Sequence, residues 1–318
     1  MKKNTASSSR LQLEKFVTQE TGHPIAQTPS QWVNFFKQQS GVAAILFYGS
    51  GLRDHTPDDE VVYDFYLLVN RFRDYKANPF LALAGRLVPP NVYFFEEVFD
   101  GKPQRCKVAV LRLDQFYKAA TRQSFTPHIW ARFCQPSRIV FAETDKICRE
   151  LNQSITNAIL TFHEETLHLI DSCSPADFWT IGLRSTYADE IRSEKNNRAR
   201  LIFEANRTSC TKKSELAIAC LSRLAKFKPD GEIFSKIPAF QKKRRVFVRR
   251  FFRPFKKGVI LLRLMKATFT FQGNIDYARW KIERHSGVKI EISDFHRRHP
   301  ILGGLALCLR VTKRGGIR

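Results

Sequence analysis

A single carboxylate that closely follows a glycine-rich turn is the feature of this sequence best suited to chemistry. One apolar segment ends in Tyr48-Gly49-Ser50-Gly51, and the next apolar segment carries Asp64 near its start. A turn of small residues lets phosphates approach the backbone, whose N–H groups and a serine hydroxyl can hold phosphate oxygens. Mg²⁺ prefers oxygen ligands and commonly takes one or two carboxylates together with phosphates. The pattern therefore predicts a site for Mg²⁺ and a nucleoside triphosphate, with Asp64 as the metal ligand.

The alternative interpretation of the glycines is a tight turn without chemistry, which the same residue types would form. Asp64 favours the chemical interpretation, because acids are disfavoured in strands and are almost never fully buried without a partner. It requires a partner, a position at the rim of the sheet or a metal ion. The sequence contains neither a Walker A lysine nor a GxSxG segment, so P-loop and hydrolase interpretations have no support.

Strands that alternate with helices are expected to position these residues. Apolar, β-rich segments lie at 43–48, 61–69, 91–95, 107–113 and 138–141, with helical patterns at 30–39, 71–87 and 130–133. Asp114 is expected to cap a helix that follows the fourth strand. This alternation predicts an α/β sheet domain over residues 1–145.

The pattern becomes helical and amphipathic after residue 145. Helices are expected within 146–169, 176–206 and 214–227, and Pro229-Asp230-Gly231 forms a turn. We therefore expect a helical second domain over residues 146–230. Its charged segment at 185–195, with Tyr187, Asp189 and Arg192, is either a solvated helix with ion pairs at i,i+3 and i,i+4 or part of the site.

Positive charge concentrates in a third region, residues 231–318. The net charge of the 318 residues is +23, and residues 240–318 hold 21 Lys or Arg against 4 Asp or Glu. Such an asymmetry indicates a polyanionic partner, either nucleic acid or an anionic membrane surface. No apolar segment reaches the roughly 20 residues of a membrane span, and the N-terminus lacks the apolar core of a secretory signal. Seven scattered cysteines without CxxC spacing indicate a reducing compartment.

Residues 241–258 interleave nine basic residues with phenylalanines and contain no acid. Aromatic and basic side chains together suit single-stranded nucleic acid or the interface of an anionic bilayer. A solvated basic face above a phenylalanine core is the third interpretation. The apolar residues 259–271 follow directly, and 301–311 repeat the apolar-then-basic order, which favours the membrane.

Several blocks in order resemble the mitochondrial translocator-maintenance family of CDP-diacylglycerol synthases (phosphatidate cytidylyltransferases) and its bacterial relatives. The resemblance extends over roughly residues 44–290. The blocks are Tyr48 to Gly51, Asp64 to Val69, Pro90 to Phe94, Lys107 to Val110, Ala131 to Pro136 and Tyr187 to Glu194. In the fifth block the family's glycine and lysine are replaced.

The resemblance implies a nucleotidyltransferase-fold sheet domain, a winged-helix-like helical domain and a basic amphipathic element that docks on a membrane. The implied reaction converts CTP and phosphatidic acid to CDP-diacylglycerol and pyrophosphate with Mg²⁺. The implied location is the cytoplasmic face of a bacterial inner membrane or the matrix face of the mitochondrial inner membrane. Nucleic acid is not expected as a partner. The alternatives are an RNA-directed nucleotidyltransferase and a non-catalytic, membrane-associated scaffold.

The resemblance also assigns roles to residues. Asp64 and Lys107 are expected to be catalytic, with Asp64 as the metal ligand. Tyr48, Gly49, Ser50, Gly51 and Arg132 are expected to bind the nucleotide, and Tyr187, Asp189 and Arg192 to close the site from the second domain. The membrane and phosphatidate set is Arg249, Arg250, Phe251, Phe252, Lys256 and Lys257.

The sequence departs from the wider nucleotidyltransferase pattern at one position. Many such enzymes carry a second acid two residues after the first, and Tyr66 stands there in this chain. We expect Asp114, Glu96 or Glu97 to supply a second ligand, and a mechanism with one metal ion stays open.

Overall fold

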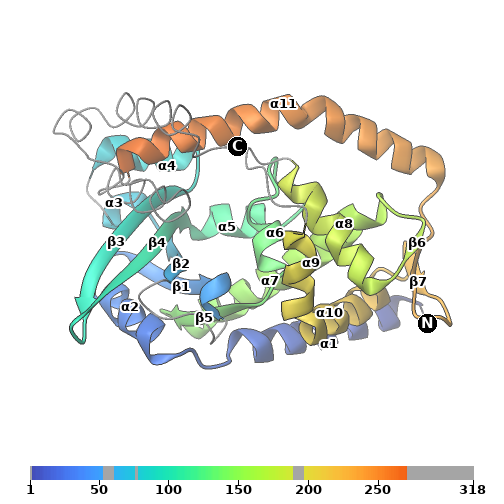
Figure 1. The fold of residues 1–318 in the computed structure, drawn as a ribbon, viewed down its shortest axis with the longest axis horizontal. Coiled ribbons are helices and arrows are strands. Elements are labelled where there is room, and N and C mark those ends of the chain that lie inside the picture. The colour runs from blue at the N-terminus through green and yellow to red at the C-terminus, as the bar shows by residue number, and fades with distance from the viewer. Residues whose placement is uncertain (1, 53–60, 76–77, 189–196, 271–318) are drawn as a thin grey trace.

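A mixed five-stranded sheet covered by helices forms the first half of the chain, in a computed structural model that describes residues 2–52, 61–75, 78–188 and 197–270 (Figure 1). The strand order is β3-β4-β2-β1-β5. The strands are β1 (Val42–Tyr48), β2 (Val62–Val69), β3 (Asn91–Phe99), β4 (Lys102–Arg112) and β5 (Ser137–Ala142). β2 and β4 are parallel, and the other neighbours are antiparallel. The predicted α/β fold is confirmed.

Alternate residues of the central strands face two separate cores, because successive side chains of a strand point to opposite faces. One face carries Tyr66 and Leu68 and packs against α5 (Leu113–Ala119), α6 (Trp130–Phe133) and α7 (Asp145–Leu167). The other face carries Phe65 and Leu67 and packs against α2 (Gln27–Lys37) and α3 (Phe72–Tyr75). We call these the α7 face and the α2 face. Asp64 precedes Tyr66 by two residues in β2, so its side chain points to the same side of the sheet and lies on the α7 face.

Local sequence explains where the short helices begin. The Asn78 side chain accepts a hydrogen bond from the N–H of Leu81 and caps α4 (Pro79–Leu87). The expected cap at Asp114 is wrong, because α5 already begins at Leu113 and Asp114 lies in its first turn. An acid in that turn still interacts favourably with the helix dipole.

The first helix was not expected, since the sequence reads only as a polar start. α1 (Lys2–Thr21) packs against α7 and α10 (Arg207–Cys220), where two of its apolar residues, Leu13 and Val17, are fully buried. It lies along the lower edge of the molecule in Figure 1. Tertiary packing, and not a strong amphipathic pattern, therefore accounts for this helix.

A hydrogen-bonded chain of buried polar groups links the helices of the second half. The Trp179 indole N–H donates to the Ser214 hydroxyl (2.9 Å), which donates to His163 Nε2 (3.1 Å), and His163 Nδ1 donates to the Ile159 carbonyl (2.8 Å). These residues belong to α7, α8 (Pro175–Tyr187) and α10, and α9 (Arg198–Ala205) packs beside α8. These hydrogen bonds suit a neutral imidazole at His163 and fix the spacing of the three helices.

A small sheet interrupts the helices expected in the second domain. β6 (Ser172–Cys173), β7 (Ala225–Phe227) and β8 (Ile233–Ser235) pair in the order β6-β8-β7. The helix expected over 214–227 ends instead at Cys220, and its last residues form β7. Gly231, with φ of +81°, turns the β7–β8 hairpin, so the boundary expected after residue 230 falls inside that hairpin.

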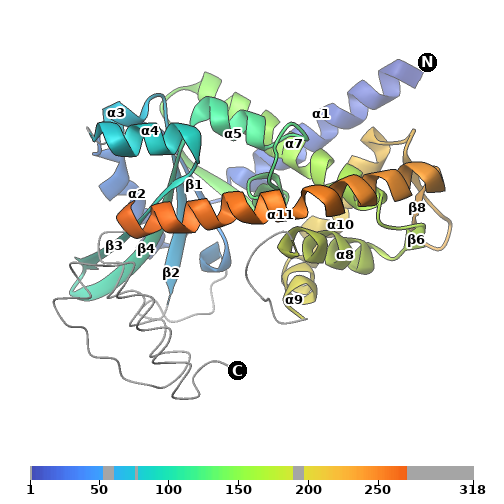
Figure 2. The same ribbon diagram turned by 90° about the horizontal axis from the view of Figure 1, so that it is seen from above.

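One long helix, α11 (Ala239–Thr270), passes from the small sheet to β3 (Figure 2). It contains the basic residues 241–258 and most of the apolar segment 259–271 in one continuous element. Within the part of the chain that the structure describes, no helix is both long enough and apolar enough to cross a membrane. The apolar segment 301–311 lies outside the described residues.

Candidate functional site

The turn after β1 depends on a glycine in a conformation that other residues avoid. Gly49 has a φ of +90°, in the region where only glycine is unstrained. Its carbonyl accepts a hydrogen bond from the N–H of Leu52 (3.3 Å), which closes the short 3-10 turn η1 (Ser50–Leu52). Gly49 and Ser50 are exposed. The turn thus presents backbone and a hydroxyl group at the end of β1, as the sequence predicts.

Asp64 lies directly across from this turn on the neighbouring strand. The β1–β2 register pairs Tyr48 with Asp64, and a Cβ built on Gly49 would lie 3.3 Å from Asp64 Oδ2. The carboxylate is half-buried, at the rim of the α7 face. The expected proximity of acid and turn is therefore confirmed, and Gly49 leaves open the space beside the carboxylate that any larger residue would fill.

A lysine extends this row across the sheet. β2 and β4 are parallel with Asp64 opposite Lys107, so these two residues and Tyr48 occupy adjacent positions on the same face. Lys107 is half-buried. In this arrangement Asp64 can bind a cation on the side of the glycine turn. The ammonium group of Lys107, on the other side of Asp64, can interact with phosphates.

Helix α6 covers this row from the α7 face. The Phe133 ring lies 5.8 Å from the Tyr48 ring and 5.3 Å from the Tyr66 ring. Arg132 precedes Phe133 and donates through Nη1 to the carbonyl of His128 (2.7 Å). Arg132 is therefore carried on the same short helix that packs beside the candidate site.

A second arginine, whose place the sequence does not reveal, acts on His128 together with Arg132. Burial lowers the pKa of His128 well below its ordinary range, and the charges of Arg263 and Arg132 lower it further. Both guanidinium groups consequently lie close to His128, although Arg263 belongs to α11, far along the chain. Its only signal in the sequence is a charge inside an apolar helical segment. Arg263 brings a further cation toward the α7 face.

Gly51 has a structural reason to lack a side chain. A Cβ at this position would lie 2.9 Å from Tyr63 Cδ1 and 3.1 Å from Phe47 Cζ. Tyr63 and Phe47 belong to the core of the α2 face. The second glycine of the turn is thus explained by packing, whereas Gly49 faces the acid.

None of the three acids considered as second ligands lies beside Asp64. Asp114 is far away and paired with an arginine, Glu96 is two strands away and also paired, and Glu97 lies on the opposite face of the sheet. Arg112 is opposite Val69, so Asp114 lies beyond the other end of β2, about 16 Å along the strand, and its carboxylate contacts Arg112 at 2.5 Å. Glu96 lies two strands away and accepts from Arg105 (2.8 Å). Glu97 follows it on the opposite face. No group of three His, Cys, Asp or Glu side chains among the described residues could hold a metal ion.

The second-domain residues are only partly described. Tyr187 is the last residue of α8 and packs against the core of the α7 face. Asp189 and Arg192 lie outside the described residues. The carbonyls of Ser185 and Ala188, at this end of α8, accept hydrogen bonds from arginines of α11. The end of α8 is therefore fixed to the basic helix.

The residues expected to bind membrane and phosphatidate divide between two faces of α11. Phe251, Arg250 and Lys257 are exposed on the outward face. Arg249 donates to the Ser185 carbonyl, and Phe252 packs edge-on against Phe125; Lys256 lies on this inward face as well. The helix therefore presents one set to solvent and turns the other toward the protein.

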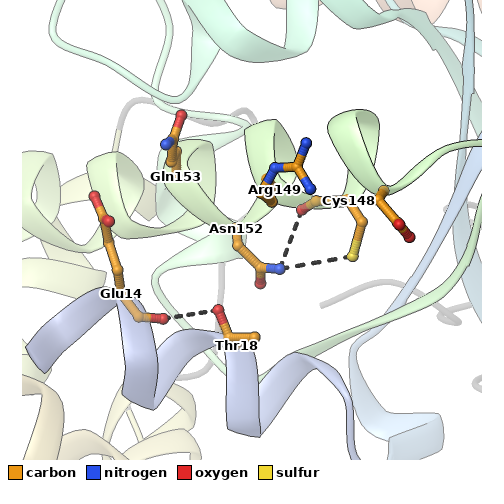
Figure 3. Close-up of a pocket in the computed structure, with 7 residues that line it drawn as sticks. Glu14, Thr18, Cys148, Arg149, Asn152 and Gln153 are labelled. Carbon is orange, nitrogen blue, oxygen red and sulfur yellow. Dashed lines mark hydrogen bonds between the residues drawn. The ribbon is translucent and has the colours of Figure 1, made fainter. Parts of the chain in front are cut away.

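A separate pocket of about 350 Å³ lies between α1 and α7 (Figure 3). Thr18 donates to the carbonyl of Glu14, and Asn152 donates to the carbonyl of Cys148. The lining residues are Glu14, Thr18, Asp145, Cys148, Arg149, Asn152 and Gln153. Its side chains bond largely to their own helices and its charges nearly balance, so it adds nothing to the site at Asp64.

No protein-family model matches this chain, and no curated protein matches it significantly in sequence.

Proposed function

We propose that this protein is a Mg²⁺-dependent nucleotidyltransferase that transfers the cytidylyl group of CTP to phosphatidic acid and releases pyrophosphate. The observation that carries the proposal is the close approach of Gly49 and the Asp64 carboxylate across β1 and β2, with Lys107 opposite Asp64 on β4. CTP and phosphatidate come from the family resemblance of the sequence.

The proposed fold assignment is a nucleotidyltransferase sheet followed by a winged-helix-like unit. The mixed sheet, with its acid beside the turn that ends β1, supports the first part. Helices α7 to α10 together with the small sheet of β6, β7 and β8 support the second part.

The residues present fit a metal site that relies on the nucleotide for most of its ligands. Asp64 lies beside the turn, and the missing Cβ of Gly49 leaves room at its Oδ2 atom. Mg²⁺ commonly accepts one protein carboxylate when phosphates and water complete its shell. The chemistry that Mg²⁺ supplies when bound is neutralisation of the charge on the departing pyrophosphate.

The chain's own groups position and neutralise the phosphates. The exposed turn at Gly49 and Ser50 holds the triphosphate, while Lys107 and Arg132 offset its charge. An oxygen of the phosphatidate phosphate forms the new bond to the α-phosphorus of CTP. The bond from that phosphorus to the β-phosphate breaks, and its electron pair leaves with pyrophosphate. Because the attacking oxygen is already anionic, the reaction needs no strong general base.

The outward face of α11 supports a position at an anionic bilayer. Its exposed apolar residues, which include Phe247, Phe251, Phe255 and Leu262, recur at intervals of about one helical turn. Exposed cations, including Lys243, Arg244, Arg250 and Lys257, lie among them. Each basic residue near such a surface contributes about 1 kcal/mol of attraction.

The proposal is tested by pyrophosphate release with each nucleoside triphosphate in turn, supplied with Mg²⁺ and either phosphatidate vesicles or RNA. We expect release with CTP and phosphatidate alone. Release that requires RNA would favour the RNA-directed enzyme, since aromatic and basic side chains also suit single strands. No release with any acceptor would favour the scaffold. Vesicle flotation, which should require anionic lipid and weaken with salt, tests the membrane part separately.

A further inference from the structure

A basic pocket of about 280 Å³ lies under the middle of α11, away from the turn at Gly49. Its walls are the inward face of α11 and the loop between α5 and α6, and its floor includes Glu165 of α7. Figure 2 shows α11 crossing the molecule where these elements meet. The lining residues are Arg122, Gln123, Ser124, Phe125, Glu165, Arg245, Val248, Arg249, Phe252 and Lys256.

Cations outnumber carboxylates in this pocket. Four lining residues are Lys or Arg and one is Glu165, which is 13 % exposed and contacts both Arg122 (3.3 Å) and Arg245. Arg122 also contacts Glu164 beside the pocket. Among the described residues, four cations thus meet two carboxylates, Glu164 and Glu165. The largely buried carboxylate of Glu165 holds two guanidinium groups in place where several cations gather, and charge-assisted hydrogen bonds from such cations suit a phosphate.

An aromatic pair lies at the same pocket. Phe125 and Phe252 pack edge-on with ring centroids 6.3 Å apart, and they are 47 % and 41 % exposed. The Phe251 and Phe255 rings lie 5.2 Å and 6.1 Å from Phe252 and continue the aromatic surface outward along α11. Cations inside and exposed aromatic rings outside match a molecule with an anionic head and an apolar body.

We propose that this pocket binds the phosphate headgroup of one anionic phospholipid molecule. The phosphate lies among the cations around Arg122 and Lys256, and the acyl chains leave past Phe125 and Phe252 toward the aromatic face of α11. The volume suits one headgroup, whereas a nucleic-acid strand needs a continuous groove. Leu261 and Leu262, both 53 % exposed, extend the apolar surface with side chains that bases cannot stack on. Lipid binding in this pocket is separate from the transfer reaction and does not depend on it.

Two neighbouring lysines of α11 provide the test. Lys256 lines the pocket, and Lys257 is exposed on the other side of the helix. Lys256→Gln and Lys257→Gln remove the same charge from adjacent positions. Each variant is titrated with a water-soluble, short-chain phosphatidylglycerol, an anionic phospholipid that is not the acceptor of the proposed reaction, in the absence of nucleotide and membrane, at fixed ionic strength. We expect saturable 1:1 binding to the wild type and to Lys257→Gln, and binding at least about 10-fold weaker to Lys256→Gln, a loss of about 1.4 kcal/mol.

Arg122→Gln provides a second variant on the opposite wall of the pocket and should weaken binding to a similar extent. Its fold is checked by urea unfolding, and Arg245 still pairs with Glu165 in its absence. Equal affinities of the Lys256 and Lys257 variants, or no saturable binding to the wild type, would overturn the proposal. Displacement by inorganic phosphate at the same concentration would make this a free-phosphate site, and stronger displacement by a single-stranded oligonucleotide would make it a nucleic-acid site.

Discussion

Replacing Gly49 by alanine should show whether this turn binds metal and nucleotide or only reverses the direction of the chain. With a φ of +90°, an alanine at this position is strained by about 1–3 kcal/mol. The new methyl group would also lie 3.3 Å from Asp64 Oδ2, so the carboxylate must shift by a few tenths of an ångström. The same methyl group fills the space that the proposed metal and triphosphate require.

Two other glycines provide matched controls. Gly101 and Gly231 have φ of +74° and +81°, and a Cβ at either position would meet nothing within 4 Å. Gly231→Ala and Gly101→Ala therefore introduce the same kind of backbone strain without an obstacle. We expect all three variants to lose a similar free energy of unfolding, measured with urea, because each alanine is forced into the same kind of strained backbone conformation.

Only Gly49→Ala should lose function. We expect Mg²⁺-dependent CTP binding, measured by calorimetry, to weaken by at least about 10-fold, which is 1.4 kcal/mol. Pyrophosphate release should fall by about 100-fold, the effect that a displacement near 1 Å can have on a reaction. Wild-type affinity and turnover in Gly49→Ala, with a stability loss equal to that of the controls, would refute the reasoning and leave Gly49 as a turn residue.

Three further predictions concern stability. Lys213→Met removes the partner of Glu20, which is 2.6 Å from the buried ammonium, and should cost about 3–5 kcal/mol in urea unfolding; recovery is expected when Glu20→Gln is added, and a neutral single variant would contradict the pairing. Gly182→Ala places a Cβ 2.5 Å from Phe162 Cζ and should cost about 1–3 kcal/mol, whereas an unchanged urea midpoint would show that the helices can separate. Burial, as the largest cause, lowers the pKa of His163 from 6.5 to about 4. The unfolded chain therefore binds the proton first, so stability is complete above pH 6.5 and falls by roughly 3 kcal/mol toward pH 4; His163→Gln should flatten this part of the profile, and a profile of equal slope in both proteins would refute it.

The strands and the site turn could be predicted because their signals are local. Each apolar segment is short and bounded, and Asp64 interrupts an apolar strand in a way that demands an explanation. A glycine after β1 likewise predicts a turn without knowledge of the fold. The register that brings Asp64 opposite both Tyr48 and Lys107 then follows from strand pairing.

Features set by contacts between distant parts of the chain could not be predicted in this way. α1 is stabilised by packing on α7 and α10, and its own sequence reads as polar. β7 continues what looks like a helical segment, because pairing with β8 overrides local preference. The charge of Arg263 acts on His128 only because α11 crosses the molecule, and its place cannot be inferred from spacing along the chain.

The most direct test of the central claim is the rate of pyrophosphate release by Asp64→Asn, with CTP, Mg²⁺ and phosphatidate vesicles. The asparagine keeps the size of the side chain and removes its charge. Glu97→Gln, on the opposite face of a nearby strand, removes the same charge and serves as the control. We predict a loss of at least about 100-fold in Asp64→Asn alone, because charge stabilisation by a bound metal contributes several kcal/mol. Equal rates in the two variants would contradict the account.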